Sequence, residues 1–244
     1  MRLVGANFCR DRLCPMCTWR NSLEVFRELS AVMDKAMETE VLTPIFLTLT
    51  VKSAPAEDLK GTIDLMYAAW DRLFSRKTFK RAYLGWFRAL EITYNGKTGE
   101  YHPHFHAILL VHPDYFTGKD YRRTEQWVQE WRKAARLSYD PVCDIRAVKE
   151  KGTSRKAYVE VAKYTAKDSD YLKPDPTTTD RIVKALIATL RGRRLYAYGG
   201  ILKPIAKDYA AQIKAEKAKL RADVESVIIN YRWIIGLGRY ERME

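Results

Sequence analysis

Three of the four histidines in this chain occupy alternate positions of one short segment, Tyr101-His102-Pro103-His104-Phe105-His106. Residues two apart in an extended strand project from the same face of a sheet. Apolar and β-branched residues at 88–94 and 107–111 favour strands on both sides, and residues 95–99 supply turn chemistry between them. The sequence therefore predicts a β-hairpin with a row of imidazoles on one face.

A carboxylate, Glu91, lies on the first strand of this predicted hairpin and could reach the row of histidines. Imidazole and carboxylate groups at such density are typical ligands of a divalent metal. A single histidine in a strand is more often a hydrogen-bonded structural residue. Three alternating histidines favour a metal site instead, and we predict one here.

The charge of the chain points to a polyanionic partner. Its 244 residues allow one domain with small appendages, and 47% of them are hydrophobic, which is enough for a sizeable core. Lysine and arginine number 43 against 30 acidic residues, a formal net charge of +13, which favours nucleic acid. No apolar run approaches the length of a membrane span, and residues 1–8 are too short for a signal peptide. We therefore expect a cytoplasmic protein without a membrane partner.

Three of the four cysteines are clustered, at Cys9, Cys14 and Cys17. In a cytoplasmic protein cysteines act as metal ligands or free thiols more often than as disulfides, and this spacing resembles half of a zinc-binding knuckle. The fourth ligand is open: Cys143 is the remaining cysteine, and His112 is the histidine outside the row. The alternative is a redox or incidental Cys-x-x-Cys pair. We predict a structural Zn²⁺ site in residues 8–20.

Hydrophobic periodicity predicts an α+β fold with a central antiparallel sheet flanked by helices. The predicted helices cover residues 21–37, 56–75, 121–138, 154–167, 179–191 and 204–224. The predicted strands, besides the hairpin, cover residues 43–51, 142–149, 195–200 and 227–235. Residues 168–170, Asp-Ser-Asp, are expected to break the helix before them. We expect one domain over residues 1–200, with the helix and strand of residues 201–244 packed on it.

A metal beside a basic surface is suited to phosphodiester chemistry, which also needs a nucleophile. Of the fifteen tyrosines, Tyr164 shares a predicted helix face with Glu160 and Lys167, because residues three and four apart are neighbours. A phenol has a pKa near 10, and the cations of Lys163, Lys167 or the metal would favour its nucleophilic form. The alternative is a packing tyrosine beside a solvated ion pair. Together with the histidine row, the segment favours a tyrosine nucleophile.

These motifs resemble, in their order, those of the replication initiators of rolling-circle plasmids, within the HUH endonuclease superfamily. Residues 46–51 are similar to the family's first strand motif, His104-Phe105-His106 to its metal-binding motif, and Tyr164-Thr-Ala-Lys167 to its Tyr-x-x-Lys motif. Glu160 matches the subgroup with a glutamate four residues before the tyrosine. The cysteine motif of residues 9–17 also resembles that subgroup. The similarity extends over residues 8–200 and implies a ferredoxin-like antiparallel sheet.

The resemblance implies a DNA nickase and strand transferase. Such enzymes cut one strand at a plasmid origin, in an unpaired segment, and the tyrosine becomes joined to the 5′ phosphate. The free 3′ hydroxyl is then extended by a polymerase. Glu160 would activate water for the terminating cleavage. No second tyrosine stands beside Tyr164, which fits this tyrosine–glutamate version better than one with two tyrosines.

The resemblance also implies the ligands and partners. His104 and His106 would bind Mn²⁺ or Mg²⁺, and the third ligand is either Glu91 or His102, which could instead orient a ligand. The partners would be plasmid origin DNA, single-stranded at the nick, with a host helicase and polymerase. Residues expected to contact DNA phosphates are basic: Arg10, Arg12, Arg20, Lys163, Arg122, Arg123, Arg132, Lys133 and residues 191–194.

Two alternative functions remain open from the sequence. The first is another HUH enzyme, a transposase or a conjugative relaxase, although relaxases usually have the tyrosine near the N-terminus and Tyr164 follows the histidines. The second is a non-catalytic zinc-containing nucleic-acid-binding protein. That alternative accounts for the charge and the cysteines, but it leaves the histidine row unexplained.

Overall fold

The computed structural model describes residues 8–9, 11–148, 158–159, 161–162, 168–224, 231–234 and 239–242, with side chains up to residue 216. The chain divides into two compact units, residues 1–206 and residues 207–244. The first unit thus extends six residues beyond the predicted boundary at 200. The predicted packing of residues 201–244 stays a prediction.

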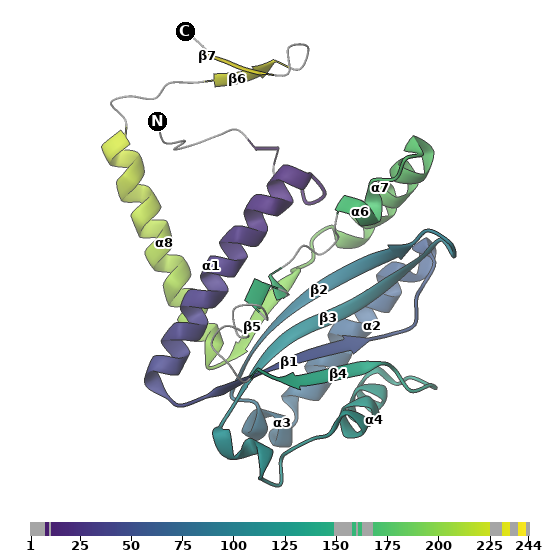
Figure 1. Cartoon of the computed structure of the whole chain (residues 1–244), viewed down its shortest axis with the longest axis vertical. Coiled ribbons are helices and arrows are strands. Elements are labelled where there is room, and N and C mark those ends of the chain that lie inside the picture. The colour runs from purple at the N-terminus through teal and green to yellow at the C-terminus, as the bar shows by residue number, and fades with distance from the viewer. Residues whose placement is uncertain are drawn as a thin grey trace. The chain divides into compact units, whose positions relative to one another are not determined.

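The first unit is built on a five-stranded sheet in the order β4-β1-β3-β2-β5 (Figure 1). Every neighbouring pair of strands is antiparallel. The strands are β1 (Thr43–Thr50), β2 (Gly85–Asn95), β3 (Glu100–Val111), β4 (Cys143–Ala147) and β5 (Tyr196–Gly200). The structure confirms the predicted α+β class and the hairpin at its centre, because β2 and β3 pair directly through the turn at residues 96–99.

One face of the sheet is covered by three helices: α2 (Ala56–Ser75), α3 (Lys77–Ala82) and α4 (Thr124–Ala135). Alternate residues of β3 point toward them. Phe105 is fully buried there, with its ring 5.8 Å from that of Trp70 on α2 and 6.3 Å from that of Trp131 on α4. Burial of each such aromatic side chain contributes on the order of 2 to 3 kcal/mol, so this face carries the main core.

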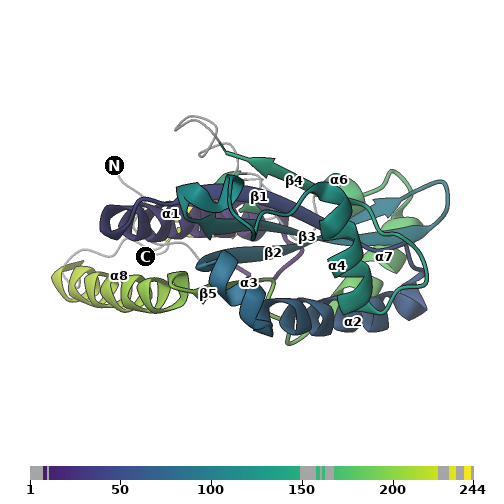
Figure 2. The same ribbon diagram turned by 90° about the horizontal axis from the view of Figure 1, so that it is seen from below.

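The other face of the sheet carries the histidines. Figure 2 shows α1 (Pro15–Thr39) and α2 on opposite sides of the sheet. Helix α1 begins earlier than expected because Pro15 occupies its first turn, where a proline costs no hydrogen bond. Its buried residues recur at helical spacing: Val25, Leu29, Val32, Met33 and Ala36. The histidine face is thus bordered by an amphipathic helix that buries its apolar side.

The remaining elements extend from this frame. In the first unit they are η1 (Pro113–Phe116), α6 (Asp168–Tyr171) and α7 (Pro176–Leu190); α8 (Leu202–Val224) begins there and continues into the second unit. The second unit also contains β6 (Tyr231–Ile234) paired with β7 (Arg239–Arg242). Residues 168–170 form the start of the separate short helix α6, while residues 163–167 lie outside the described part of the chain, so the expected helix break stays a prediction. The hairpin partner β7 was not predicted.

Candidate active site

The register of the central hairpin brings a carboxylate between two imidazoles. Glu91 of β2 pairs directly with His104 of β3, and Ala89 pairs with His106, so all three polar side chains share one face. One oxygen of Glu91, Oε2, lies 3.2 Å from Nε2 of His104 and 2.8 Å from Nε2 of His106. The possible ligand atoms of the three residues lie within 4.8 Å of one another. This group could hold a metal ion.

The histidine rings are held in the orientation that a metal ligand needs. Nδ1 of His104 lies 3.2 Å from the backbone oxygen of His102, and Nδ1 of His106 lies 3.1 Å from Oγ1 of Thr48 on β1. An Nδ1–H that donates to oxygen leaves the Nε2 lone pair free for a metal. The side chains of Glu91, His104 and His106 are only 6%, 11% and 13% exposed. Two imidazole nitrogens and a carboxylate oxygen in such a setting suit a divalent cation.

His102 lies outside this group. Its Nδ1 is 3.4 Å from Oγ of Ser53, and its ring centroid is 5.6 Å from that of His104. Burial lowers the pKa of His102, and the neighbouring His104 lowers it further. The geometry therefore favours Glu91 over His102 as the third ligand, a choice that the sequence left open.

The predicted nucleophile segment lies mainly outside the described residues, which include neither Glu160, Lys163, Tyr164 nor Lys167. The adjacent Tyr158 is buried, and its pKa is raised to about 12 by burial and then by Asp34 of α1. A buried phenol with a raised pKa is unsuited to attack, so Tyr158 is a poor nucleophile, and the choice of Tyr164 stays a prediction.

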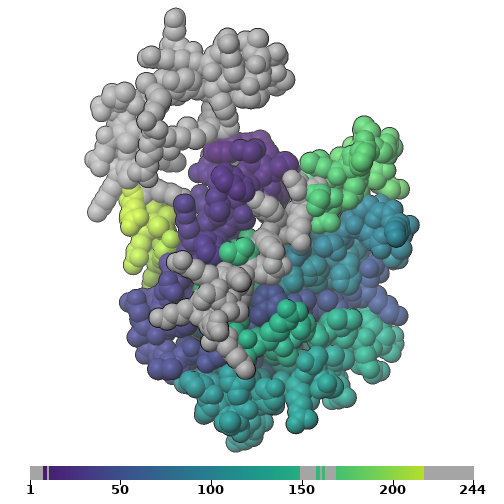
Figure 3. Space-filling view, in the orientation of Figure 1, coloured from purple at the N-terminus to yellow at the C-terminus, as the bar shows by residue number. Residues whose placement is uncertain are grey.

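Tyr171 also has a packing role. It is 1% exposed, and its hydroxyl donates to the backbone oxygen of Leu13 over 2.7 Å. Arg12 donates through one nitrogen to the backbone oxygens of Leu190, at 2.7 Å, and Arg193, at 2.9 Å. Figure 3 shows the start of α1 and the α6–α7 segment beside each other on one face. Arg12, expected to contact DNA, therefore holds the cysteine loop against the end of α7, and Leu13 joins the loop to α6.

The three clustered cysteines converge as predicted. The sulfur atoms of Cys9, Cys14 and Cys17 lie within 4.8 Å of one another, and those of Cys9 and Cys17 are 3.4 Å apart. Cys14 is the N-cap of α1, and a hydrogen bond from the backbone of Cys17 is the main cause that lowers its pKa. A lowered pKa favours the thiolate, which is the form that binds metals. The group could hold a second metal because its three sulfur atoms converge.

Cys143 does not belong to this group, which corrects its prediction as the fourth zinc ligand. It lies in β4, paired with Leu49 of β1, and it is buried in the main core. Burial raises the pKa of the Cys143 thiol to about 12, so the side chain behaves as a small apolar residue. The other candidate, His112, lies 3.4 Å from Glu40 and is also outside the group.

Several of the predicted phosphate-contacting arginines have partners within the protein. Arg20 pairs with Glu24 at 3.6 Å and lies over the ring of Phe8, and Arg132 pairs with Asp140. Arg10 lies outside the described residues. Exposed pairs of this kind are weak, so Arg20 and Arg132 can exchange partners when a phosphate approaches.

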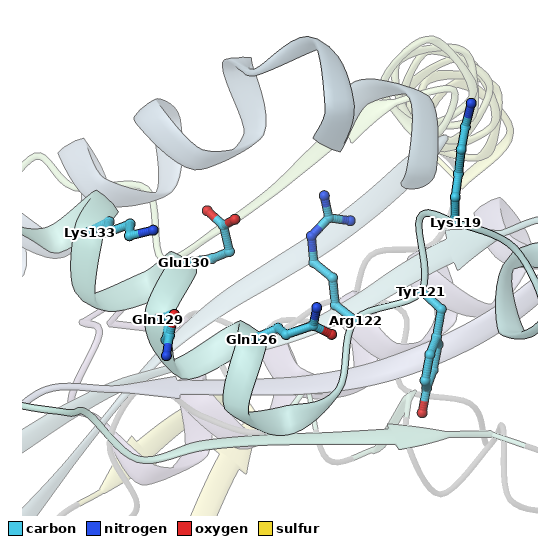
Figure 4. A pocket seen from close by; sticks show the side chains of 7 residues that line it. All are labelled: Lys119, Tyr121, Arg122, Gln126, Gln129, Glu130 and Lys133. Carbon is cyan, nitrogen blue, oxygen red and sulfur yellow. The ribbon is translucent and has the colours of Figure 1, made fainter.

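A polar cavity of about 260 Å³ lies beside α4, on the side of the sheet away from the histidines (Figure 4). One cationic side chain of the cavity, Arg122, already has partners. It donates a hydrogen bond to the backbone oxygen of Asp120, and its guanidinium lies 4.5 Å from the centroid of the Phe79 ring. Glu130 in the wall pairs with Arg76. The Tyr121 ring points away from the Lys119 ammonium in Figure 4. This cavity is not part of the metal centre.

The sequence reasoning missed Thr48, which shapes the centre, and Arg88, which packs in the core on the other face of the sheet. Thr48 orients His106, and the alternation of Thr48 and Thr50 in β1 was the available signal. Arg88 is buried on the opposite face, 4.3 Å from the centroid of the Tyr67 ring and 4.6 Å from that of Phe105. Burial lowers the pKa of Arg88.

Within the described part of the chain, no helix has the length and apolar character needed to cross a membrane.

An antiparallel α+β domain with a buried Glu–His–His centre is the class that this geometry defines, and comparisons with known proteins specify it further. The model of the replication protein family, Rep_1, matches residues 1–233. "Protein rep" of Bacillus sp is 40% identical over 225 residues, which cover 85% of this chain and 73% of that protein. The chain belongs to the replication protein family.

Other relatives agree. "Protein rep" of Bacillus amyloliquefaciens is 40% identical over 225 residues, covering 85% of this chain and 66% of the relative. "Protein rep" of Streptococcus pneumoniae is 37% identical over 211 residues, covering 85% and 65%. These two relatives are thus matched over just under two thirds of their length. No solved structure matches. The family confirms the resemblance to replication initiators that the motifs indicated.

Proposed function

We propose that this protein initiates rolling-circle replication of a plasmid by nicking one strand of the origin with a tyrosine nucleophile. The observation that carries the proposal is the convergence of Glu91, His104 and His106 in a chain of the replication protein family. The order of motifs in the sequence, with Tyr164-Thr-Ala-Lys167 after the histidines, supports the HUH subgroup with one tyrosine and one glutamate.

The residues fit a catalytic Mn²⁺ or Mg²⁺. Glu91 Oε2 and the Nε2 atoms of His104 and His106 would hold it. The chemistry supplied by such a metal is polarisation of a non-bridging phosphate oxygen. Thr48 and the backbone oxygen of His102 keep both imidazoles in place, so that the centre needs little reorganisation.

Tyr164 would attack the scissile phosphorus. The phenol oxygen forms a bond to phosphorus while the bond to the 3′ oxygen breaks, and the strand is left with a 5′ phosphotyrosine and a free 3′ hydroxyl. Lys167 and Lys163, as neighbours on the predicted helix, would favour the phenolate. In the terminating step, Glu160 would take a proton from the water that attacks phosphorus. Hydrolysis would release the strand without a second tyrosine.

Zn²⁺ held by Cys9, Cys14 and Cys17 would be structural and separate from the catalytic metal. The partners we propose are plasmid origin DNA, single-stranded at the nick, and a host helicase and polymerase in the cytoplasm. The net charge of +13 supports binding to DNA phosphates.

The proposal is tested by trapping the covalent intermediate. The protein is incubated with single-stranded origin oligonucleotides, labelled on the 3′ side of the nick, and Mn²⁺, and the products are separated under denaturing conditions. We expect a labelled protein–DNA adduct that disappears with EDTA and in Tyr164→Phe, because removal of the hydroxyl leaves no nucleophile. Tyr121→Phe, on the loop before α4, is the matched control and should form the adduct normally. An adduct that persists in Tyr164→Phe would exclude this nucleophile.

The role of Glu160 has its own test. Glu160→Ala should form the adduct at a rate close to that of the unaltered protein but release it by hydrolysis roughly 10²- to 10⁴-fold more slowly, since a general base typically contributes this much. The release of adduct is followed over time after excess unlabelled oligonucleotide is added. Hydrolysis at the original rate in Glu160→Ala would remove the water-activating role and leave the nucleophile assignment standing.

A further inference from the structure

A second cavity, of about 260 Å³, lies at the edge of the sheet beyond the end of β1. Figure 1 shows the chain passing from β1 to α2, which lies behind the sheet. The walls come from residues 51–55 between these elements, from the first turns of α2, and from Leu137 and Tyr139 of the segment before β4. Three segments that are distant in sequence therefore build one cavity.

The cavity has apolar walls and a few polar groups. Half-buried Pro55, Leu65 and Leu137 provide the apolar surface, and Asp58 and Thr62 of α2 add polar atoms. Ligand pockets in proteins are commonly apolar with a few placed polar groups, and they usually measure about 300 to 1,000 Å³. A cavity slightly below this range is suited to one small ring system rather than to a larger ligand.

Tyr139 and Lys52 form the polar side of the cavity. The hydroxyl of Tyr139 accepts a hydrogen bond from the backbone N–H of Lys52, at 2.8 Å. The Lys52 ammonium lies 4.4 Å from the centroid of the same ring. Among the residues that the structure describes, no carboxylate forms an ion pair with Lys52. The ammonium can therefore leave the ring at little cost, since cation–π contacts at exposed sites are worth about 0.5 to 1 kcal/mol.

The cavity adjoins the metal centre through the outermost histidine. Oγ of Ser53, in the cavity wall, lies 3.4 Å from Nδ1 of His102, whose ring neighbours that of His104. Reciprocal backbone hydrogen bonds of 2.8 Å between Ala54 and Tyr101 fix this segment to β3. His102, which lies outside the metal-ligand group, thus stands between the metal centre and the cavity.

We propose that this cavity binds a base of the DNA strand next to the phosphate held at the metal centre. The inference rests on the proposed function, which supplies the strand. The base stacks on Tyr139 in place of the Lys52 ammonium, and the ammonium then pairs with the phosphate of the same nucleotide. Stacking of bases on aromatic side chains, with cations along the backbone, is the usual way in which proteins hold single-stranded DNA.

The test is equilibrium binding of fluorescein-labelled single-stranded dA20, dC20 and dT20 to the full chain without added Mn²⁺ or Mg²⁺, where no cleavage occurs. Tyr139→Ala should weaken binding roughly 5- to 100-fold, the range expected for loss of one stacked base. Tyr139→Phe keeps the ring and should bind within about threefold of the unaltered protein. Tyr121→Ala, a tyrosine beside the cavity in Figure 4, is the matched control and should bind normally.

Lys52 gives an independent readout. Lys52→Ala should reduce the slope of log affinity against log salt concentration by about 0.7, the value for one phosphate contact on a single strand. Binding by Tyr139→Ala and Lys52→Ala equal to that of the unaltered protein would overturn the inference. If dTMP displaces dT20 and binds as tightly as dT20 does, the inference is also overturned, because the ligand would then be a free nucleotide. If the unaltered protein binds none of the three strands, the proposed function itself fails.

Discussion

Replacement of His106 or His104 by alanine should abolish binding of Mn²⁺ and lower the rate of strand cleavage by at least 10²- to 10³-fold, the typical cost of losing an electrostatic contribution to the transition state. Each residue supplies one of the two Nε2 atoms that face Glu91 Oε2. Two ligands cannot retain a cation that competes with bulk water for its coordination shell. Calorimetric titration with Mn²⁺ and the rate of adduct formation measure the two effects.

His102→Ala is the control for this prediction, since His102 lies on the same strand face but contacts Ser53 rather than Glu91. The affinity of His102→Ala for Mn²⁺ should stay within about tenfold of that of the unaltered protein. This is the smaller of the losses in metal affinity expected when a residue beside the ligands is replaced. Loss of metal binding in His102→Ala equal to that in His106→Ala would show that the third ligand is misassigned.

The second large effect concerns the cysteine loop. Cys14→Ser should release Zn²⁺ and lower the free energy of unfolding by about 3 to 5 kcal/mol, because loss of a structural metal is among the most destabilising changes. The loop between Cys9 and Cys14 carries Arg12 and Leu13, which are bonded to α7 and to Tyr171. Without the metal, the loop is less constrained before folding, so more conformational entropy is lost when it makes these contacts.

Urea unfolding and zinc content measured with a chromogenic chelator test this prediction. Cys143→Ala is the matched control, because Cys143 is a cysteine buried in the core and apart from the group. It should keep its zinc and lose only about 1 kcal/mol from the small cavity. Full zinc content and unchanged stability in Cys14→Ser would contradict a structural metal at this loop.

The central hairpin and one side of the candidate site could be predicted because local signals agree there. Alternation of His102, His104 and His106 with apolar residues fixes which face each side chain occupies, and a shift of register by one would bury the imidazoles in the main core. The same register places Glu91 opposite His104. Turn residues, strand pattern and metal chemistry all required the same arrangement.

The parts that could not be predicted depend on contacts between distant segments. The hydrogen bond from Tyr171 to Leu13 joins residues 158 positions apart, and no local pattern indicates it. Cys143 was one of two candidates for a fourth zinc ligand because it is the remaining cysteine, whereas its pairing in β4 buries it in the main core. The short helix α6 at residues 168–171 was not predicted, because Asp and Ser favour turns, and the tertiary packing of Tyr171 supports it.

The choice between Glu91 and His102 shows the same limit. Both side chains point to the histidine face, so periodicity alone did not separate them. The separation came from the cross-strand pairing of Glu91 with His104 and from the contact of His102 with Ser53, beyond the end of β1.

Anomalous diffraction from crystals of the protein soaked in Mn²⁺ is the most direct measurement of the central claim, which is a cation held by the two strands of the hairpin. We predict one strong manganese peak bonded to Glu91 Oε2 and to Nε2 of His104 and His106, on the face of the sheet away from α2. A peak coordinated by His102 without Glu91, or no peak on this face at saturating Mn²⁺, would contradict the claim.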